Sequence, residues 1–388
     1  MTTKKSLKSS FLLLAITLLV SCNQESKTPA DSFTVSGDIK GLDTKYMSRS
    51  VYDSSGKRVT DSIFVKDGKF TYTAKINKAE HIIFWPNVER TIKRSGRGYY
   101  PAKSSQFAFI ANPGDHIVFE GEVTDFINAY PTGTKTNDDL AKINSKIFPL
   151  INASVNYLLK KNKLEKEAPR FKIITDSIAQ LDEEVIRLKS DFIKKNPTSE
   201  AAVWYLSDMM VRRQISNEEA VAIFNKFDKS LENFTYYKEL ASRVKGIEST
   251  LIGKTVPDFT SNKTIDGSDF TFSSLRGKYV LIDFWGVWCG PCVAEMPTVK
   301  EYADKYTDKL TVLGINSGDS KEKMVNFLKE KGYDWQQVQS GKDTDNLVLK
   351  FNVAGFPTKF IIDPEGKIIQ RYLGSGEKAF EKLDELLK

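Results

Sequence analysis

Hydrophobic and polar residues alternate along residues 33 to about 130, the period-two pattern of β-strands with one buried face. Two of these runs have their apolar positions at Phe33, Val35, Ile39, Phe70, Tyr72 and Ile76. Turn signals separate such runs at Asp67-Gly68 and at Asn112-Pro113-Gly114-Asp115. We therefore predict an antiparallel β-sandwich over residues 33–135.

From residue 136 the apolar spacing becomes helical. Intervals of four, three, four, three and four residues place six side chains on one helical stripe: Ile174, Ile178, Leu181, Val185, Leu188 and Phe192. We expect Pro149 and Pro197 to break the region into several helices, and Ser216 with Glu219 to form a capping box. The stripe suits a dimeric coiled coil, but it spans under three heptads, so we favour a hairpin that packs on its own neighbours. We predict a helical spacer over residues 136–250.

From residue 251 onward, apolar runs suited to buried strands alternate with helical stretches. The predicted strands are residues 280–285, 310–315 and 359–362, and the predicted helices lie near 292–306, 320–331 and 377–387. This alternation indicates an α/β domain with a central mixed sheet over residues 251–388. The predicted fold class is thus multidomain, with a β-sandwich, a helical middle region and an α/β domain.

The first residues have the composition of an export signal. Lys4, Lys5 and Lys8 precede the apolar run FLLLAITLLV at residues 11–20. That run is about ten residues long, against about twenty needed to span a bilayer, so a transmembrane helix is disfavoured.

The apolar run ends in Leu19-Val20-Ser21-Cys22, which resembles a bacterial lipobox. The resemblance implies a signal peptide over residues 1–22, with Cys22 becoming the lipidated first residue of the mature chain. An ordinary cleaved signal with a chance cysteine is the alternative. Residues 23–32 are polar and read as a short tether.

Composition argues against a disordered chain, a nucleic-acid-binding protein and a disulfide-rich secreted scaffold. The 388-residue chain is 40% hydrophobic, which is enough for real cores, and carries a formal charge of +7. Three of the excess positive charges leave with the signal peptide, so the mature chain carries +4 and we predict no nucleic-acid partner. Three cysteines cannot form a multi-bridge secreted scaffold.

One basic stretch, residues 90–103, contains Tyr99 and Tyr100. Such a stretch can bind an anion or a glycan. A solvated hairpin loop is the simpler interpretation, and we favour it.

The main candidate for chemistry is Trp288-Cys289-Gly290-Pro291-Cys292, directly after a predicted strand. Pro291 suits the first turn of a helix, which would put Cys289 at the helix N-terminus, where the dipole favours a thiolate. Cys292 lies one turn further, within reach of a disulfide. Gly290 leaves space beside the reactive sulfur.

A Cys-x-x-Cys pair also occurs as half of a zinc site, which needs two more ligands. Cys22 is expected to be lipidated, and His81 and His116 lie over a hundred residues upstream in the β-region. We therefore predict no metal and no cofactor. A static structural disulfide is a further alternative, but the strand, Trp, Pro and helix context favours redox turnover.

The segment YVLIDFWGVWCGPC at residues 279–292 resembles the active site of thioredoxin. Further motifs resemble its TlpA/ResA-type, membrane-associated branch: Val256-Pro257-Asp258-Phe259, Leu275-Arg276-Gly277-Lys278, Glu295-Met296-Pro297 and Gly355-Phe356-Pro357-Thr358. The resemblance covers residues 251–388. Residues 33–135 resemble, through Phe-x-Val-x-Gly and Asp-Ser-x-x-Val-x-Asp-Gly-x-Phe, an uncharacterised β-domain found ahead of thioredoxin-like domains in Bacteroidetes lipoproteins.

The thioredoxin resemblance assigns roles to matching positions. Cys289 would be the attacking thiolate and Cys292 the resolving thiol of a redox-active disulfide. Asp283 would be the buried acid that takes the proton of Cys292. Glu295 matches an acidic position of the ResA-type branch, and an ordinary first-turn helix acid is an equally good interpretation of it.

The same resemblance implies a substrate groove around the dithiol. Pro357 would be the cis-proline that faces the cysteines and exposes the Phe356 backbone to a client strand. Phe356 is bulkier than the usual residue there, so the groove is expected to differ. Trp288, Gly290 and Pro291 would complete the groove, with Trp288 shielding the sulfurs.

These expectations combine into a membrane-anchored, extracytoplasmic thiol–disulfide oxidoreductase. Its partners would be disulfide-containing client proteins, a membrane thiol electron donor and the membrane itself through Cys22. The expected location is the cell envelope, facing the periplasm or at the cell surface. Gly-Pro between the cysteines is similar to reducing thioredoxins, which favours reduction of clients.

Two rival functions stay open. A surface-tethered binding module could carry the dithiol as an accessory. A thiol peroxidase is the other, but it needs a Pro-x-x-x-Thr-x-x-Cys motif that residues 284–292 do not supply.

Overall fold

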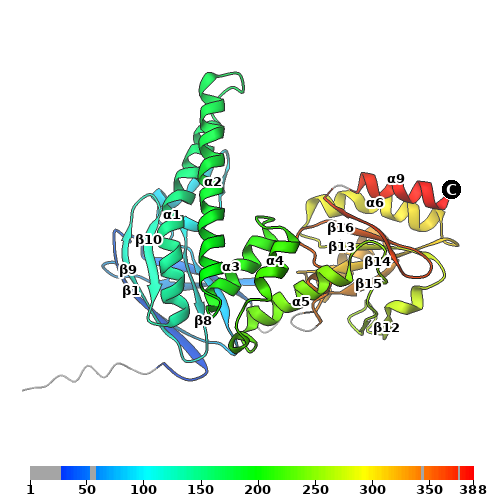
Figure 1. Ribbon diagram of the computed structural model, residues 1–388, viewed down its shortest axis with the longest axis horizontal. Coiled ribbons are helices and arrows are strands. Elements are labelled where there is room, and N and C mark those ends of the chain that lie inside the picture. The colour runs from blue at the N-terminus through cyan, green and yellow to red at the C-terminus, as the bar shows by residue number, and fades with distance from the viewer. Residues whose placement is uncertain (1–27, 53–57, 342–344, 375) are drawn as a thin grey trace, which may run out of the picture.

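A computed structural model describes residues 28–52, 58–341, 345–374 and 376–388. The predicted signal peptide, Cys22 and the first part of the tether lie outside these described residues. A strand-rich part, a group of helices and a C-terminal sheet with its own helices follow one another along the chain (Figure 1). Helices α3–α5 lie between the strand-rich part and the C-terminal sheet (Figure 1).

The strand-rich part contains ten strands within the described ranges: β1 (Ser32–Lys40), β2 (Tyr46–Tyr52), β3 (Arg58–Phe64), β4 (Lys69–Lys75), β5 (Glu80–Phe84), β6 (Lys93–Ser95), β7 (Gly98–Tyr100), β8 (Phe107–Ala111), β9 (His116–Val123) and β10 (Ile127–Thr132). Four of them form one sheet in the order β10-β9-β1-β4. β1 runs parallel to β9, with Val35 opposite Ile117. The predicted all-antiparallel arrangement is therefore wrong for this pair. Alternation identifies which face of a strand is buried but is the same for parallel and antiparallel neighbours.

The other strands pair as β2–β3, β5–β8 and β6–β7. Aromatic rings from the four-stranded sheet and from the β5–β8 pair meet in one core, with Phe84 5.2 Å from Phe109 and Phe107 5.3 Å from Phe119 between ring centroids. The predicted core position Phe33 is fully buried among them. The period-two prediction is thus confirmed, whereas the sandwich arrangement stays a prediction.

The middle of the chain forms α1 (Lys135–Lys161), α2 (Pro169–Lys195), α3 (Glu200–Val211), α4 (Asn217–Phe224) and α5 (Thr235–Ser249). α2 packs on α1 as a hairpin that projects from the molecule (Figure 1), in agreement with the favoured hairpin. The predicted break at Pro149 is wrong, because α1 continues through it. Ile143, Phe148 and Val155 are buried on both sides of the proline, so packing offsets the lost backbone bond. The cap is confirmed, since Ser216 Oγ accepts from the Glu219 amide at 3.1 Å.

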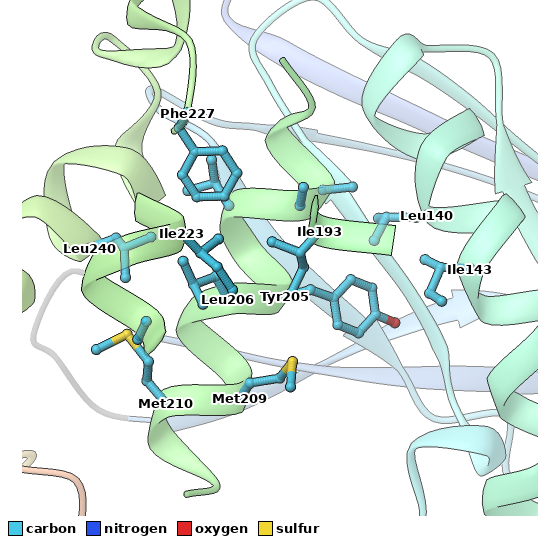
Figure 2. Close-up of a cluster of buried hydrophobic side chains, with 14 of the residues drawn as sticks. Leu140, Ile143, Ile193, Tyr205, Leu206, Met209, Met210, Ile223, Phe227 and Leu240 are labelled. Carbon is cyan, nitrogen blue, oxygen red and sulfur yellow. The ribbon is translucent and has the colours of Figure 1, made fainter. Parts of the chain in front are cut away.

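All five helices contribute to one buried cluster, which Figure 2 shows in close-up. Its labelled members are Leu140, Ile143, Ile193, Tyr205, Leu206, Met209, Met210, Ile223, Phe227 and Leu240. Ala79 and Ile110 of the strand-rich part belong to the same cluster. The helices therefore share a continuous core with one edge of the strands.

A buried polar contact reinforces this junction. The His81 ring stacks on Trp204 of α3, with centroids 4.3 Å apart, and the His81 amide donates to the Tyr236 hydroxyl at 2.6 Å. Beside them, the Asp208 carboxylate pairs with Lys103 at 2.7 Å and with Lys189 at 3.2 Å. The Lys103 side chain is thus paired at this junction and is not part of a solvated loop. Tyr99 and Tyr100 of the same basic stretch are exposed, as a solvated hairpin would have them.

The C-terminal region contains β11 (Thr260–Ser261), β12 (Phe270–Thr271), β13 (Tyr279–Trp285), β14 (Leu310–Asn316), β15 (Gln336–Gln339), β16 (Thr358–Ile362) and β17 (Ile368–Leu373), with α6 (Gly290–Lys305), α7 (Lys321–Lys331), α8 (Leu347–Lys350) and α9 (Glu377–Leu387). Five strands form a sheet in the order β15-β14-β13-β16-β17. β13 is parallel to β14 and antiparallel to β16, so the predicted mixed sheet is confirmed. β13 lies at the centre with both faces covered, which explains its continuous apolar run.

Within the described part of the chain, no helix combines the length and apolar character needed to cross a membrane.

Candidate active site

The two cysteines lie where the central strand gives way to a helix. β13 ends at Trp285, and after residues 286–288 Cys289 occupies the N-cap of α6. Cys289 Sγ accepts from the Cys292 amide at 3.3 Å. The two residues form a disulfide, with their Cα atoms 5.3 Å apart. The predicted placement at a helix N-terminus is confirmed, and the donors there favour a thiolate once the pair is reduced.

Trp288 directly precedes Cys289, and 53% of its surface is accessible. Its indole Nε1 donates to the Ser317 carbonyl at 2.8 Å. A Cβ on Gly286 would lie 2.4 Å from that nitrogen, and one on Gly318 would lie 2.9 Å from it. Both glycines are therefore needed for the indole to lie against the backbone.

A residue not singled out from the sequence holds the loop in front of the cysteines. The buried Asp319 carboxylate accepts from the Val287 amide at 2.7 Å and from Asn316 Nδ2 at 3.0 Å. Its other oxygen pairs with Lys323 Nζ at 2.7 Å. Asp319 follows β14, the parallel neighbour of β13, so only the sheet pairing brings it beside residue 287.

The Phe356–Pro357 peptide bond is cis, as the resemblance predicts. The Phe356 ring packs edge-on against Trp288, with centroids 5.2 Å apart. Thr358 Oγ1 donates to the Gly355 carbonyl at 2.7 Å and closes the turn before β16. Phe356 also packs against the buried cluster that contains both cysteines. Trp288 and Phe356 thus form one surface next to the disulfide, although nearly seventy residues separate them in the sequence.

The two predicted acids meet on a shared cation. Asp283 of β13 lies opposite Lys359 of β16, and both side chains are almost fully buried. Lys359 Nζ lies 3.0 Å from Asp283 Oδ1 and 2.7 Å from Glu295 Oε2. Glu295 Oε1 also accepts from the Gly376 amide at 2.6 Å, next to the start of α9. Lys359 was not singled out from the sequence. The signal that could have identified it as a site residue is its charge at the start of a predicted buried strand, residues 359–362.

Burial and charge pairing oppose each other in this triad, which Asp283, Glu295 and Lys359 form. Burial has the larger effect on the pKa of Asp283. It raises the pKa of Asp283, and the charge of Glu295 adds to that shift while Lys359 opposes it. Burial lowers the pKa of Lys359, but the charge of Asp283 and the hydrogen bond to Glu295 outweigh burial and leave it above its ordinary value. The ammonium therefore stays charged. Two carboxylates share this one cation, so Asp283 is the group suited to hold a proton.

The contacts described for Asp283 lead to Lys359, and none of them joins it to a sulfur atom. The structure thus brings the predicted site residues together in two groups. One consists of the disulfide and its surface around Trp288 and Phe356. The other is the acid pair held by Lys359.

Two family models match the chain. Residues 251–387 match Redoxin, and residues 33–140 match a domain of unknown function, DUF4369. The C-terminal match contains both cysteines and both acids.

The relatives that resemble this chain align with about a third to two fifths of its length. The thiol-disulfide oxidoreductase ResA of Bacillus cereus is 32% identical over 156 residues, which are 40% of this chain and 86% of that protein. ResA of Bacillus subtilis is 36% identical over 132 residues, 34% of this chain and 72% of that protein. The crystal structure of the thioredoxin domain of a thiol-disulfide oxidoreductase from Bacteroides vulgatus aligns with 36% of this chain and 99% of that domain, at 26% identity and a TM-score of 0.33. The ResA matches and the Redoxin model show that this chain belongs to the ResA/TlpA-like thiol–disulfide oxidoreductases of the thioredoxin family and is an enzyme.

Proposed function

We propose that the protein is a membrane-anchored, extracytoplasmic reductase of protein disulfides that works through Cys289 and Cys292. The observation that carries the proposal is the Cys289–Cys292 disulfide at the N-terminus of α6, beside the surface formed by Trp288 and Phe356. This arrangement puts a reactive sulfur where the helix stabilises its thiolate, directly after the exposed Trp288.

The first step starts from the reduced enzyme. The Cys289 thiolate attacks one sulfur of a client disulfide, so a Cys289–client bond forms and the client S–S bond breaks. The other client sulfur leaves as a thiolate and takes a proton from solvent. Cys289 is the attacking residue because it caps the helix, whereas Cys292 lies one turn inside and is less accessible.

In the second step Cys292 resolves the mixed disulfide. Asp283 accepts the Cys292 proton, and the Cys292 sulfur attacks Cys289 and displaces the client as a thiolate. The client has then gained two electrons, and the enzyme holds the Cys289–Cys292 disulfide. The raised pKa of Asp283 makes its carboxylate a stronger proton acceptor than an ordinary aspartate.

Clients are proposed to bind along the surface next to the dithiol. The Phe356 backbone, ahead of Pro357, would pair with an extended client segment, with Trp288, Gly290 and Pro291 lining the same groove. The edge-on packing of Phe356 on Trp288 supports a single continuous surface. The large Phe356 ring would exclude bulky client side chains there.

The oxidised enzyme must be recharged with two electrons. We infer a membrane thiol electron donor, in keeping with anchoring through a lipid on Cys22 in the cell envelope. The lipobox-like segment before Cys22 supports this placement. Residues 33–135 and 136–250 would then position the redox domain of residues 251–388 relative to the membrane.

An insulin-reduction assay tests the proposal. The full mature chain with a supplied dithiol should reduce insulin, Cys289→Ser should abolish this activity, and Cys292→Ser should accumulate a mixed disulfide with the client. Cys22→Ser is the matched control, because it removes the third cysteine and should leave activity in solution unchanged. An intact chain that reduces no disulfide under these conditions would refute the reductase assignment.

A further inference from the structure

The helical region touches the loop that leads to the proposed client groove. α5 packs on α8, the short helix that precedes this loop. A Cβ on Gly246 of α5 would lie 2.6 Å from the carbonyl oxygens of both Leu349 and Lys350. The backbone of α5 is therefore in direct contact with the C-terminal end of α8, and only glycine allows this approach.

One turn earlier on α5, Arg243 clamps the next residues of the loop. The buried guanidinium Nη1 donates to Asn352 Oδ1 at 3.3 Å and to the Val353 carbonyl at 3.2 Å. Asn352 has a φ of 46° and is held from the other side, since Arg371 of β17 donates to its carbonyl at 2.7 Å. Burial and the nearby Arg371 lower the pKa of Arg243 to about 10, so it still carries its charge at neutral pH.

A second arginine of the helical region reaches the same loop. Arg213 follows α3, is exposed, and places Nη2 3.7 Å from where a Cβ on Gly355 would be. Gly355 directly precedes Phe356 and Pro357. Burial lowers the pKa of Arg371, and the charge of Arg213 adds to this shift. Three guanidinium groups thus surround the loop of residues 352–355.

Arg243 is buried whereas Arg213 is exposed, and this difference gives the two arginines different roles. Arg243 is buried and donates its hydrogen bonds to the Val353 carbonyl and the Asn352 side chain. It therefore fixes the position of the loop that borders the groove. Arg213 is solvent-exposed at the rim, where its guanidinium can pair with a carboxylate of a bound client. Both residues lie outside the Redoxin match of residues 251–387.

We propose that the helical region forms one wall of the client groove, in which Arg243 positions the loop and Arg213 selects clients that carry an acidic residue beside the target cysteine. The inference rests on the proposed function, since it takes the surface around Phe356 as the groove. A guanidinium at the rim favours an acidic neighbour and disfavours a basic one by simple charge complementarity.

Two synthetic peptides test the selection. Each carries one disulfide, and they differ only in having Glu or Lys next to the cysteine. The pre-reduced full mature chain is mixed with each peptide, and its oxidation is followed by tryptophan fluorescence. The wild-type enzyme should react about threefold faster with the Glu peptide at low concentrations, and added salt should reduce this preference.

Substitutions at Arg213 should change the preference in a predictable order. Arg213→Lys should retain part of it, Arg213→Gln should abolish it, and Arg213→Glu should reverse it. Lys245→Gln is the matched control, because it removes an exposed cation from α5 and should leave the preference unchanged. The rate with bis(2-hydroxyethyl) disulfide, a small molecule without charged groups, is measured for every variant, and the peptide rates of that variant are divided by it.

The positioning role has a separate readout. Arg243→Gln should raise the half-saturation concentration of both peptides severalfold and lower the rate with either peptide more than the rate with bis(2-hydroxyethyl) disulfide, and Arg243→Lys should restore part of the loss. Equal rates for the two peptides in the wild type, or an unchanged preference in Arg213→Glu, would overturn the inference. An enzyme that reduces neither peptide nor the small disulfide would instead refute the proposed function.

Discussion

Lys359 donates to Asp283 across the two central antiparallel strands of the C-terminal sheet, with Nζ 3.0 Å from Oδ1. The same ammonium lies 2.7 Å from Glu295 Oε2 on α6. One buried cation therefore connects the strand before the dithiol, the helix after it and the strand that follows the cis-proline. Loss of the cation would leave two carboxylates facing each other in a poorly hydrated site.

The first prediction concerns this cation. Lys359→Met should lower the free energy of unfolding at pH 7 by about 3 kcal/mol, because it leaves the buried Asp283 and Glu295 without their partner. The loss should be smaller at pH 5, since removing the cation raises the pKa of Asp283 further and protonation relieves the repulsion. Urea unfolding at both pH values measures this difference.

Lys300→Met is the matched control, because Lys300 lies on α6 and pairs with Asp304 at the surface. It should change stability by less than about 0.5 kcal/mol at either pH. Equal losses at pH 5 and pH 7 for the Lys359 variant would argue against a protonation-dependent triad.

The second prediction separates the two steps of exchange. Asp283→Asn should slow the attack of Cys292 on the mixed disulfide by about 100-fold, because the substituted amide cannot accept the proton. The initial attack by Cys289 should keep its rate. Rapid acid quenching with mass spectrometry would follow the mixed disulfide over time. Asp304→Asn, at an exposed position of α6, serves as the control, and a variant that resolves the mixed disulfide at the wild-type rate would remove Asp283 from the mechanism.

The third prediction concerns the loop before the cysteines. Asp319→Ala should leave the Val287 amide and Lys323 without their buried acceptor, at a cost of about 1–3 kcal/mol. Hydrogen exchange at the Val287 amide should become faster than in the wild type. Asp334→Ala, at an exposed carboxylate, should leave both stability and exchange unchanged. Unaltered protection of Val287 in the Asp319 variant would contradict its role in holding the loop.

The fourth prediction concerns acid stability at the junction between strands and helices. Burial lowers the pKa of His81 to about 3, and the charge of Lys103 adds to this shift while Asp208 opposes it. Between about pH 6.5 and pH 3 the unfolded chain therefore binds a proton that the folded chain excludes. Stability should fall with decreasing pH in this window by about 1.4 kcal/mol per pH unit from His81 alone.

His81→Phe should remove this contribution and keep the ring stacked on Trp204 and the backbone bond to Tyr236. Its unfolding free energy should depend less steeply on pH than that of the wild type between pH 6 and pH 4. His116→Phe is the control, because His116 is exposed on β9. Identical slopes for the His81 variant and the wild type would show that His81 is protonated in the folded chain.

Local sequence was sufficient wherever a feature depends on neighbouring residues. A buried strand that runs into Cys289-Gly290-Pro291 places the first cysteine at a helix N-terminus, because proline and the free amide groups determine that geometry within one turn. The Asp67-Gly68 turn behaves in the same way, since both residues have positive φ. The period of the apolar residues likewise predicted which faces are buried.

Contacts between distant segments needed the tertiary structure. Alternation cannot choose a partner strand, so the parallel β1–β9 pair was not predictable, and burial on both sides of Pro149 outweighed its local tendency to break a helix. The sequence by itself determined the cysteine pair, the helix that it begins and the α/β fold class around them. Only the tertiary structure decided that Lys359 joins the two acids and that Arg243 holds Asn352 and Val353, because these contacts join residues 64 to 110 positions apart.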